Sequence, residues 1–594
     1  MNEHALWHRA KSEFSYAYDQ NTLHLVLRTE KNDVTSARVL FGDPFQWENL
    51  DGTQTWVNET KSLEKRYSNN LYDYYFIAIH PPFYRTKYIF ILSSNEKTYA
   101  SGSRRLFSID INQPFYDQFD LSDFYNFPYI NDEDLHQTPS WVKDTIWYQI
   151  FPDRFYNKDN KTDHTWGHLP VKNHEFYGGN INGIIEKIPY LKDLGINGIY
   201  FTPMFESPSA HKYDTTDYFK IDPQFGTNED FKRLVEIAHE NGIKVMLDGV
   251  FNHAGFYHPF FQDVILHGEK SVYKDCFYIK RFPVVNFDVT DLKKRHQIKP
   301  GDLNYSTFAF APYMPKWRTD HPLVKKHLLD CVRYWIESYD IDGWRLDVSN
   351  EISHTFLRDI KDVSRQAKKD VFILGENWDN STPWLLGDQM DAVMNYELAF
   401  PLWKYLEHQI DLNTFKELMI NYMALTPKNI MENMFNLVGS HDTVRIKRRL
   451  DDDPRRVKLA YLLLFLSSGA PTIYYGDEIG LTGNHDPDNR RCMLWDARDH
   501  DMDFYYFMKK LIGLRKTEPI FKDYDFKFIE SDLLAFHKGA HKELLVLINN
   551  SDQDVHITHD VCVGHYLDLI TNKPVTLYDK IHLEAYQFLL LKRM

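Results

Sequence analysis

Charged residues stand at the ends of two apolar runs in the second half of the chain. Arg345 and Asp347 lie two residues apart in IDGWRLDV, so on a strand their side chains point the same way. Because an apolar strand cannot easily bury a lone Arg or Asp, we expect the two to be neighbours, with the guanidinium keeping the carboxylate ionised. Glu376 follows VFILG, an apolar setting that favours the protonated form of a carboxyl group. An ionised Asp and a protonated Glu are the nucleophile and the general acid of glycoside hydrolysis.

Further polar residues end other apolar runs. Asp248 and His253 close IKVMLDGVFNH, and His441 and Asp442 close MFNLVGSHD. If these runs are strands of a barrel, their ends meet at one face, and Asp442 joins the two carboxylates described above. Three carboxylates at one mouth push their pKa values apart, which favours distinct roles. Each residue alone is equally well explained as half of a structural ion pair, but chance is a poor explanation for the whole set.

The elements that would position these residues alternate between strand and helix. Eight apolar runs predict parallel strands buried on both faces: TIWYQIF, INGIYFT, IKVMLDGVF, IDGWRLDV, VFILGENW, DAVMNYEL, MFNLVGSHD and PTIYYGDEIG. Helices are predicted between them, one opened by a capping box at Thr227–Asp230 and closed at Asn241-Gly242, and another over 322–338. This alternation predicts an α/β fold, a (β/α)8 TIM barrel with insertions.

A chain of 594 residues is too long for one core, and the pattern divides it into three parts. Short β-branched and aromatic runs over residues 1–125 predict an N-terminal β-sandwich. Residues 126–505 form the predicted barrel, with an inserted subdomain at about 253–315 because that stretch exceeds an ordinary loop. Strand-like runs after one more helix predict a C-terminal β-sandwich over 506–594.

Composition narrows the class of partner. A formal net charge of −15 argues against a nucleic-acid-binding protein, which would carry a basic surface. No apolar run approaches the 18 residues of a membrane span, and the first residues lack the apolar segment of a signal peptide, so we expect a cytoplasmic location and no membrane contact. The cysteines are scattered and are expected to be reduced structural thiols: Cys276, Cys331, Cys492 and Cys562.

Four spaced motifs carry a family resemblance. DGVFNH (248–253), GWRLDVSNE (343–351), GENW (375–378) and VGSHD (438–442) closely resemble the signature regions of the α-amylase superfamily. YQIFPDRF, HKYDTTDYFKIDPQFG and MPKW extend the match over the whole barrel. VSNE, MPK and an N-terminal region ending in FPYIN are similar to the neopullulanase, cyclomaltodextrinase and maltogenic amylase group of glycoside hydrolase family 13.

The resemblance implies roles for the residues that match these motifs. Asp347 matches the nucleophile, Glu376 the general acid/base, and Asp442 the carboxylate that stabilises the transition state. Arg345 matches the arginine that orients the nucleophile, and Asp248 a buried acid that supports the site. The sugar in subsite −1 is expected to contact four further residues: Tyr213, which stacks on the ring, His211, His253 and His441.

Two residues are candidates for the acceptor side of the site. Glu351 lies in SNE and Trp378 in GENW; the alternatives are a solvated loop carboxylate and a packed indole. The sequence also departs from the group here. Asn377 and Asp379 stand where such enzymes usually have an aliphatic residue and His. Arg318 follows MPKW in place of the usual MPKLN, and Cys276 stands where a Trp is commoner.

A calcium site is also implied, near the start of the barrel. The matching oxygen ligands are Asn157, Asp159, Asp163, Gly178 and Asn180. Thr162 and Asn180 replace an expected Asn and Asp, which lowers the ligand charge. A solvated turn rich in Asp and Asn explains the same residues equally well. No organic cofactor is expected.

The expected activity is therefore retaining hydrolysis of α-1,4 bonds in cyclodextrins, short malto-oligosaccharides or pullulan. Cleavage of α-1,6 bonds and transglycosylation are expected in addition. The resemblance also implies a homodimer formed through the N-terminal sandwich. Two other enzymes remain open, an α-1,6-acting oligosaccharide glucosidase and a starch α-amylase. A third alternative, from another class, is a catalytically inactive carbohydrate-binding relative, against which the three acids argue.

Overall fold

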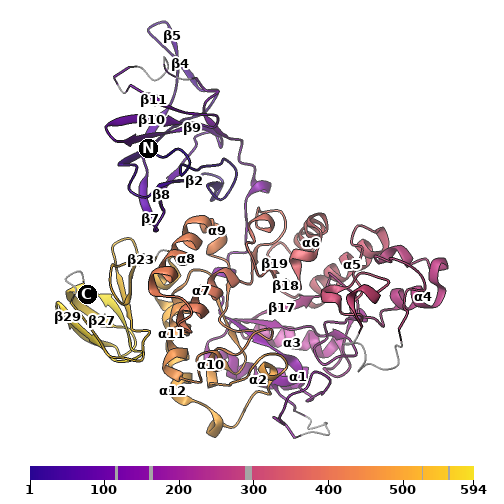
Figure 1. The fold of residues 1–594 in the computed structure, drawn as a ribbon. Helices are drawn as coiled ribbons and strands as arrows, with labels where there is room; N and C mark the ends of the chain where they lie inside the picture. The colour runs from indigo at the N-terminus through magenta and orange to yellow at the C-terminus, as the bar shows by residue number, and fades with distance from the viewer. Residues whose placement is uncertain are drawn as a thin grey trace. The chain divides into compact units, whose positions relative to one another are not determined.

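The computed structural model describes residues 1–110, 112–113, 118, 120–158, 165–287, 298–524, 526–558 and 562–594. The chain forms two compact units. The first contains residues 1–137, 385–388 and 410–431, and the second contains 138–384, 389–409 and 432–594. Figure 1 colours the first strands indigo and the last ones yellow.

The first unit is built on two antiparallel sheets. One has the order β1 (Ser15–Ala17), β2 (Leu23–Glu30), β8 (Tyr72–Ile79), β7 (Glu64–Ser68). The other has the order β11 (Leu106–Ile109), β10 (Lys97–Ser101), β9 (Thr86–Ser94), β3 (Ser36–Gly42), β6 (Glu59–Ser62), and β12 (Tyr125–Phe127) also pairs with β9. Alternate residues of β2, Leu23, Leu25 and Leu27, enter one buried cluster with Val39 of β3 and Phe90 of β9. This arrangement confirms the predicted N-terminal sandwich. The unit also contains the hairpin β4 (Trp47–Leu50) and β5 (Thr53–Trp56), and helices α8 (Leu412–Leu425) and α9 (Lys428–Met431).

The second unit contains an eight-stranded parallel barrel. Its strands in chain order are β13 (Trp147–Ile150), β14 (Gly198–Phe201), β17 (Lys244–Gly249), β18 (Gly343–Leu346), β19 (Phe372–Gly375), β20 (Ala392–Val393), β21 (Phe435–Asn436) and β22 (Ala470–Tyr474). Each pairs with its neighbour in the order β20-β19-β18-β17-β14-β13-β22-β21, and a bridge between Met394 and Phe435 joins the two ends. Every described residue of β13, β14, β18 and β19 is buried. The prediction of a TIM barrel is confirmed.

Helices surround the strands (Figure 1). They include α2 (Ile181–Leu194), α3 (Asn228–Glu240), α5 (Pro322–Tyr339), α6 (His354–Ala367), α7 (Tyr396–Leu406) and α11 (Pro454–Leu466). The predicted capping box is present at the start of α3: the Thr227 side chain accepts from the Asp230 backbone N–H, and the Asp230 side chain accepts in return. Val324, Leu328, Cys331 and Trp335 of α5 are buried, as their spacing predicts.

The segment between β17 and α5 contains helix α4 (Pro259–His267) and a set of single bridges: His253–Lys316, Phe277–Trp317 and Ile279–Tyr305. Bridges from both ends of the segment therefore fold it back on itself next to the carboxyl end of β17. Residues 288–297 of this segment lie outside the described residues.

After helix α12 (Met502–Thr517) the chain forms a second β region. One sheet has the order β23 (Lys527–Phe528), β24 (Leu534–Lys538), β25 (Leu544–Ile548), β30 (Phe588–Arg593), β27 (Gly564–Asp568), β28 (Lys573–Leu577). A separate pair consists of β26 (Val555–Thr558) and β29 (Lys580–Leu583). Leu545 and Leu547 of the sheet share a buried cluster with Ile557 and Leu583 of the pair, so the core lies between the two layers, as expected for a sandwich.

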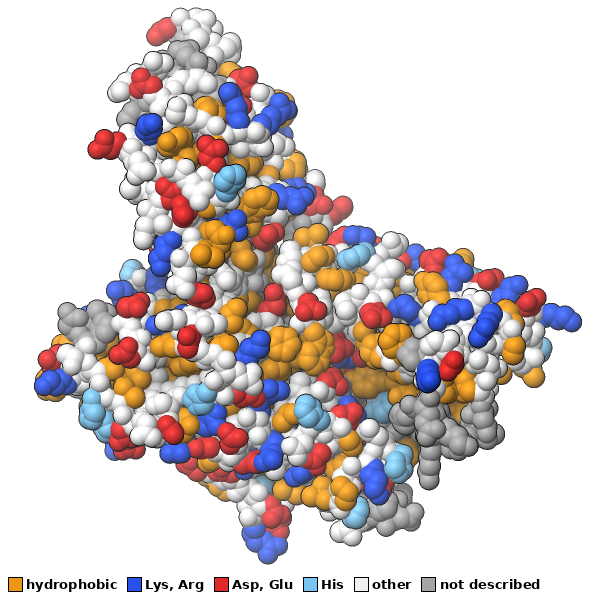
Figure 2. Space-filling model, in the orientation of Figure 1, with side chains coloured by type: hydrophobic (Ala, Val, Ile, Leu, Met, Phe, Trp, Pro, Cys, Tyr) orange, Lys and Arg blue, Asp and Glu red, His pale blue; other side chains and the backbone are white. Residues whose placement is uncertain are grey.

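The surface matches the composition. On the face that Figure 2 shows, Lys and Arg side chains are interspersed with Asp and Glu, without the continuous basic surface of a nucleic-acid-binding protein. The four cysteines, all in the described part of the chain, are buried as thiols. In the described part of the chain, no helix is long and apolar enough to cross a membrane.

Candidate active site

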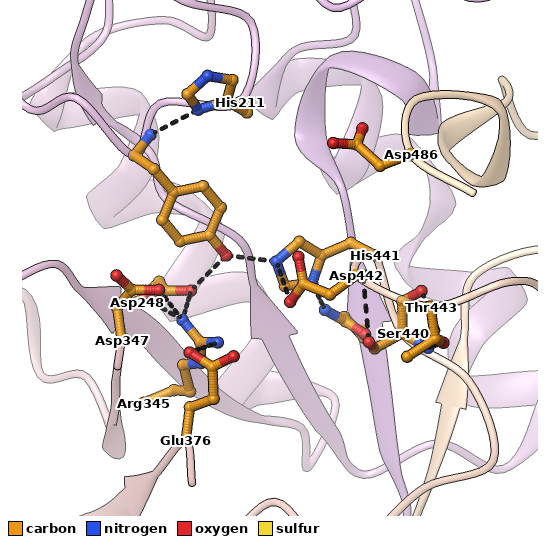
Figure 3. Close-up of polar contacts among 12 residues, drawn as sticks. His211, Asp248, Arg345, Asp347, Glu376, Ser440, His441, Asp442, Thr443 and Asp486 are labelled. Atoms are coloured by element: carbon orange, nitrogen blue, oxygen red, sulfur yellow. Dashed lines mark hydrogen bonds and ion pairs between the residues drawn. The ribbon is translucent and has the colours of Figure 1, made fainter. Parts of the chain in front are cut away.

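Arg345 is the centre of a buried charge cluster at the carboxyl ends of β17, β18 and β19. Its Nη1 lies 2.8 Å from Asp347 Oδ1 and 3.0 Å from Asp248 Oδ2, and its Nη2 lies 2.7 Å from Glu376 Oε2. The side chains of Arg345 and Asp248 are wholly buried. Figure 3 shows the guanidinium between the three carboxylates. The predicted neighbourhood of Arg345 and Asp347 is therefore present, with two further acids.

One cation shared by three carboxylates leaves a net negative cluster. Burial raises the pKa of Asp347 well above its usual value, Arg345 opposes this, and Glu376 and Asp248 add to the rise. Burial likewise raises the pKa of Asp248 to about 6, against the same guanidinium. Because the groups titrate together, the cluster holds on to protons toward neutral pH. Arg345 acts on Asp347 in the expected direction, but burial of the carboxyl group outweighs it, and the two neighbouring acids act in the same sense as burial.

Asp248 is held by two phenols in addition to Arg345. Tyr200 donates a hydrogen bond of 2.6 Å and Tyr213 one of 3.1 Å to Asp248 Oδ2. Burial keeps both phenols protonated, since it raises the pKa of Tyr200 and of Tyr213 well above the usual value. Asp248 thus fixes the orientation of Tyr213, the residue expected to stack on the sugar.

The surroundings of Glu376 differ from the prediction. Its Oε2 accepts the backbone N–H of Val348 at 2.9 Å, and its Oε1 accepts the indole N–H of Trp378 at 2.9 Å. Together with Arg345, these donors make the site polar, so the predicted apolar setting is wrong. Val348 reaches this position with a φ of 46°, in the left-handed region that β-branched residues rarely adopt. Backbone strain of this kind is found where a functional geometry is imposed.

His441 and Asp442 form the opposite side of the cluster. His441 Nδ1 faces Gln149 Nε2 at 2.6 Å, and its Nε2 faces the Tyr213 hydroxyl and Asp442 Oδ2, the latter at 3.1 Å. Burial lowers the pKa of His441 well below its usual value, so the ring is neutral. With Nδ1 accepting from the amide, the proton lies on Nε2 and is shared between Tyr213 and Asp442. The Asp442 side chain is 27% exposed, which leaves it open to a ligand.

The two other predicted histidines lie beside Tyr213. His253 is buried; its Nε2 lies 3.0 Å from the carbonyl of Tyr213, and its ring stacks on Phe308 with centroids 5.2 Å apart. His211 Nδ1 accepts the Tyr213 backbone N–H at 3.1 Å, and the two rings stack with their centroids 5.9 Å apart. Both rings are neutral, because burial lowers the pKa of His253 to about 3 and lowers that of His211. The structure thus brings the predicted subsite −1 residues together.

The two acceptor candidates differ in their contacts with Glu376. Trp378 stacks on Tyr396 with ring centroids 3.9 Å apart, and it lines a pocket of about 250 Å³ that reaches Asp442. Glu351 is exposed at its loop, where its backbone carbonyl accepts from Lys316 Nζ at 2.9 Å and its carboxylate lies 3.7 Å from the same group. Trp378 therefore contacts the Glu376 carboxylate directly, whereas Glu351 contacts Lys316.

Sequence reasoning assigned no role to several residues that contact the site. Arg490 lies 3.5 Å from Asp442 Oδ1, and its Nη1 lies 2.8 Å from Asp486 Oδ1. Gln149 sets the tautomer of His441, and Tyr200 binds Asp248. Gln149 is a polar residue in the largely apolar start of YQIFPDRF, and Arg490 lies in the loop-like run HDPDNRR. A polar side chain in each of these places was the signal that the sequence offered.

The sequence departures lie at the margin of the site. Cys276 is buried, and its Sγ lies 3.6 Å from His321 Nδ1, so it is packed within the inserted segment. Asn377 is buried next to Glu376, and its Oδ1 accepts the Asp379 backbone N–H at 3.3 Å. Arg318 pairs with Asp320 at 3.4 Å. None of these residues contacts Arg345 or the three acids through a described hydrogen bond or ion pair.

Only part of the predicted calcium site can be compared with the structure, because Asp159 and Asp163 lie outside the described residues. Asn157 Oδ1 is buried and has no hydrogen-bond partner among the described atoms, which fits a hard cation. Asn180 fits less well, since its Oδ1 accepts the Gly183 N–H at 2.8 Å and caps α2; its Nδ2 lies 3.4 Å from the carbonyl of Gly178. Among the described residues, no group of three or more His, Cys, Asp or Glu is arranged to hold a metal.

A (β/α)8 barrel with paired carboxylates at the mouth is the architecture of a glycoside hydrolase. Residues 149–523 match the α-amylase catalytic domain, and residues 1–131 match the α-amylase N-terminal Ig-like domain. The chain belongs to the α-amylase family.

Individual relatives match almost the whole chain. A cyclomaltodextrinase of Geobacillus thermopakistaniensis (strain MAS1) is 43% identical over 570 residues, 94% of this chain and 92% of the relative. An intracellular maltogenic amylase of Bacillus subtilis (strain 168) is 37% identical over 606 residues, 100% of this chain and 99% of the relative. A solved structure of a cyclomaltodextrinase is similar with a TM-score of 0.89 at 39% identity, covering 100% of both chains.

Proposed function

We propose that this chain is a retaining α-glucoside hydrolase that cleaves α-1,4 bonds of cyclodextrins, short malto-oligosaccharides or pullulan, and that also transfers glycosyl groups to sugars. The observation that carries the proposal is the single guanidinium of Arg345 bound to both Asp347 and Glu376. The similar enzymes named cyclomaltodextrinase and maltogenic amylase support the substrate class.

In the first step, Asp347 attacks the anomeric carbon of the sugar. The bond from that carbon to the leaving oxygen breaks as the Asp347–carbon bond forms, and Glu376 gives its proton to the leaving oxygen. In the second step, Glu376 takes a proton from water, and the resulting hydroxide displaces Asp347 with retained configuration. Arg345, 2.8 Å from Asp347, opposes the effect of burial on the pKa of that carboxyl group and so favours the ionised nucleophile.

The spacing of the carboxyl groups favours retention. Retaining enzymes hold the two carboxyl groups about 5–5.5 Å apart, whereas inverting enzymes leave room for a water molecule between them. Asp347 and Glu376 bind neighbouring nitrogens of one buried guanidinium, 2.8 and 2.7 Å away respectively. This close arrangement supports direct attack by Asp347. Asp442, open to ligand and close to neutral His441, is proposed to bind sugar hydroxyls and stabilise the positive charge of the transition state.

Transglycosylation requires a sugar hydroxyl to replace water in the second step. Trp378 donates to Glu376 and presents its indole at the edge of the adjoining pocket. We propose that an acceptor sugar packs on this indole, so that its hydroxyl meets the base while water is excluded.

Initial rates on β-cyclodextrin, maltotriose, pullulan and starch test the proposal, with proton NMR to identify the anomer released first. We expect faster release of glucose and maltose from β-cyclodextrin and maltotriose than from starch, with the α-anomer formed first. No release of sugar between about pH 5 and 8 contradicts the proposal and would favour a binding protein. The α-1,6-acting alternative predicts activity on pullulan or isomaltose without activity on β-cyclodextrin.

The assembly of the protein is a separate proposal. Several aromatic side chains of the N-terminal unit are exposed, including Phe45 at 76%, Trp7 at 48% and Trp47 at 45%. Exposed apolar groups support a protein contact, and we propose that a second copy of the chain covers them. Light scattering is expected to give the mass of a dimer for the wild type and of a monomer for Phe45→Asp with Trp47→Asp. A monomeric wild type contradicts the proposal.

Two further proposals concern location and calcium. The name of the similar intracellular maltogenic amylase supports an intracellular location, which cell fractionation with an antibody tests directly.

The oxygen of Asn157 that has no hydrogen-bond partner among the described atoms supports a bound Ca²⁺. If calcium binds, EGTA lowers the unfolding temperature and added Ca²⁺ restores it, whereas Asn157→Ala makes the two states equal. An unfolding temperature that EGTA leaves unchanged contradicts the calcium proposal.

A further inference from the structure

A second large pocket lies in the catalytic unit and shares no lining residue with the active site. Its volume is about 790 Å³. It is bounded by the start of α4, by α5 and by the segment from β15 (Phe205–Glu206) to Gln224. We refer to it as the α4 pocket. The mechanism proposed above makes no use of it.

The walls of the α4 pocket combine aromatic faces with acidic groups. Phe176, Tyr257 and Phe260 line it, and Tyr257 is 41% exposed although it lies in a loop between packed segments. Glu206 and Asp217 also line it, whereas no Lys or Arg is among its lining residues. Flat apolar faces suit the C–H faces of a sugar ring, and the acidic wall disfavours phosphates and other anions.

A buried histidine in the wall has an unused donor. His258 is 2% exposed, and its Nδ1 accepts the Phe260 backbone N–H at 3.2 Å at the start of α4. Burial lowers the pKa of His258 to about 3, so the ring is neutral and its proton lies on Nε2. No described residue accepts a hydrogen bond from this nitrogen. His327, whose ring centroid is 5.3 Å from that of His258, has a buried Nε2 that also lacks a partner among the described residues. A buried polar nitrogen without a partner, such as His327 Nε2, is rare in proteins unless a ligand or water satisfies it.

These groups favour a neutral polyhydroxyl ligand over a cation. Asp222 is already paired with Lys212 at 2.8 Å and Glu206 with Lys220 at 2.7 Å, which leaves Asp217 as the acid of the wall without an ion pair among the described residues. A cation also has no use for the His258 donor, whereas a sugar hydroxyl both donates to a carboxylate and accepts from an imidazole. We propose that the α4 pocket is a second sugar-binding site, which takes a terminal glucose unit of a malto-oligosaccharide between Tyr257 and the His258–His327 wall.

The pocket is connected to the active site through a buried lysine. Lys212 lies between His211 and Tyr213 in the chain and is 1% exposed. Its Nζ donates to the carbonyl of Ser207 at 3.0 Å and to Gln224 at 2.6 Å, and both partners line the α4 pocket. A sugar in the pocket would therefore bind to one side of the segment whose other side carries His211 and Tyr213.

Titration calorimetry with maltotriose tests the inference in the Glu376→Gln background, in which the ligand is not consumed. We expect two binding sites per chain. Adding Tyr257→Ala should weaken one of them at least tenfold and leave the other unchanged, and Asp217→Asn should weaken the same site. Tyr278→Ala is the matched control, since Tyr278 is 43% exposed in the same inserted segment but does not line the pocket. It should leave both sites intact.

A single site per chain, or two sites that both pocket variants leave unchanged, overturns the inference. Equal binding of glucose 6-phosphate at the second site overturns the assignment to neutral sugars. With Glu376 intact, Tyr257→Ala should keep the wild-type kcat on maltotriose. Calorimetry counts binding sites whether or not the protein is a catalyst, so it tests this inference alone. Failure of the proposed hydrolysis would instead appear as an absence of product release by the wild type.

Discussion

Arg345 lies 2.8 Å from Asp347, and its side chain is wholly buried. Because the Arg345 side chain is buried and lies two residues before Asp347, its guanidinium can turn neither toward solvent nor away from the carboxylate. It therefore fixes the carboxylate oxygen that we propose attacks the anomeric carbon. Because the same guanidinium contacts Glu376, the proposed nucleophile and the proposed acid are aligned by one group.

Arg345→Lys should damage catalysis far more than binding. An ammonium group is a single point charge and does not hold two carboxylates in a fixed plane as a guanidinium does. We expect kcat to fall by about 100-fold or more, with KM changed much less, because a small misplacement of reacting groups has an effect of that order. Steady-state kinetics on maltotriose measure both constants. A variant that loses only affinity would show that Arg345 serves the substrate and not the nucleophile.

Asp248→Asn should move the acid limb of the pH profile. The charge of Asp248 raises the pKa of Asp347, so its removal lowers that pKa, and the nucleophile remains ionised at lower pH. In the wild type, kcat/KM should decline at acid pH as Asp347 takes up a proton, and burial with the neighbouring acids places this decline above the usual pKa of an aspartate. In the variant, the decline should begin at lower pH even though the maximal rate is reduced. An acid limb shifted upward would contradict the assigned coupling.

Val348→Asn should stabilise the protein. Val348 adopts a φ of 46°, and a left-handed conformation costs an L-residue about 1–2 kcal/mol, less for Asn. We expect the free energy of unfolding to rise by about 1 kcal/mol and activity to stay within a few-fold, because the contact to Glu376 comes from the backbone N–H. Val348→Thr is the control, since it stays β-branched and relieves nothing. Urea denaturation measures the difference, and a destabilised Asn variant would refute the strain.

The N-terminal unit should be sensitive to acid through His24. Burial lowers the pKa of His24 from 6.5 to about 3, so the unfolded chain takes up the proton first as the pH falls. The contribution of neutral His24 to the free energy of unfolding is therefore fully present above about pH 6.5 and is lost progressively toward pH 3. At about pH 4.5 the loss from this residue is about 2–3 kcal/mol, and His24→Gln removes that pH dependence. Measuring the free energy of unfolding at about pH 6.5 and about pH 4.5 tests this, with exposed His4→Gln as the control. Equal acid sensitivity of the wild type and His24→Gln would contradict the prediction.

The barrel and the proximity of Asp347 to Glu376 were predictable because their signals are local. Strands such as β18 and β19 are buried on both sides, so their sequences are largely apolar runs that are followed by polar residues. In a barrel these ends meet, which is why Asp347 and Glu376 could be placed together from sequence order alone. The capping box of α3 was equally local.

The rest of the site depends on partners that are distant in the chain. One donor to Glu376 is the backbone N–H of Val348, a group that every residue but proline has, so the residue type at position 348 does not predict it. The contact between Gln149 and His441 joins residues 292 positions apart, and Arg490 approaches Asp442 from a loop whose course periodicity does not reveal. The polar contacts that Val348, Trp378 and Arg345 make with Glu376 form only in the folded chain, which is why the expected apolar setting of Glu376 was wrong.

Trapping of the glycosyl-enzyme tests the central claim most directly. Fluoride leaves without the help of an acid, so the Glu376→Gln variant should react with α-maltosyl fluoride yet hydrolyse the product slowly, because it lacks the base. Peptide mass spectrometry should then find one maltosyl group on the peptide that contains Asp347. A maltosyl group on the peptide that contains Asp442, or turnover of the fluoride with no adduct and with inverted product, would contradict the account.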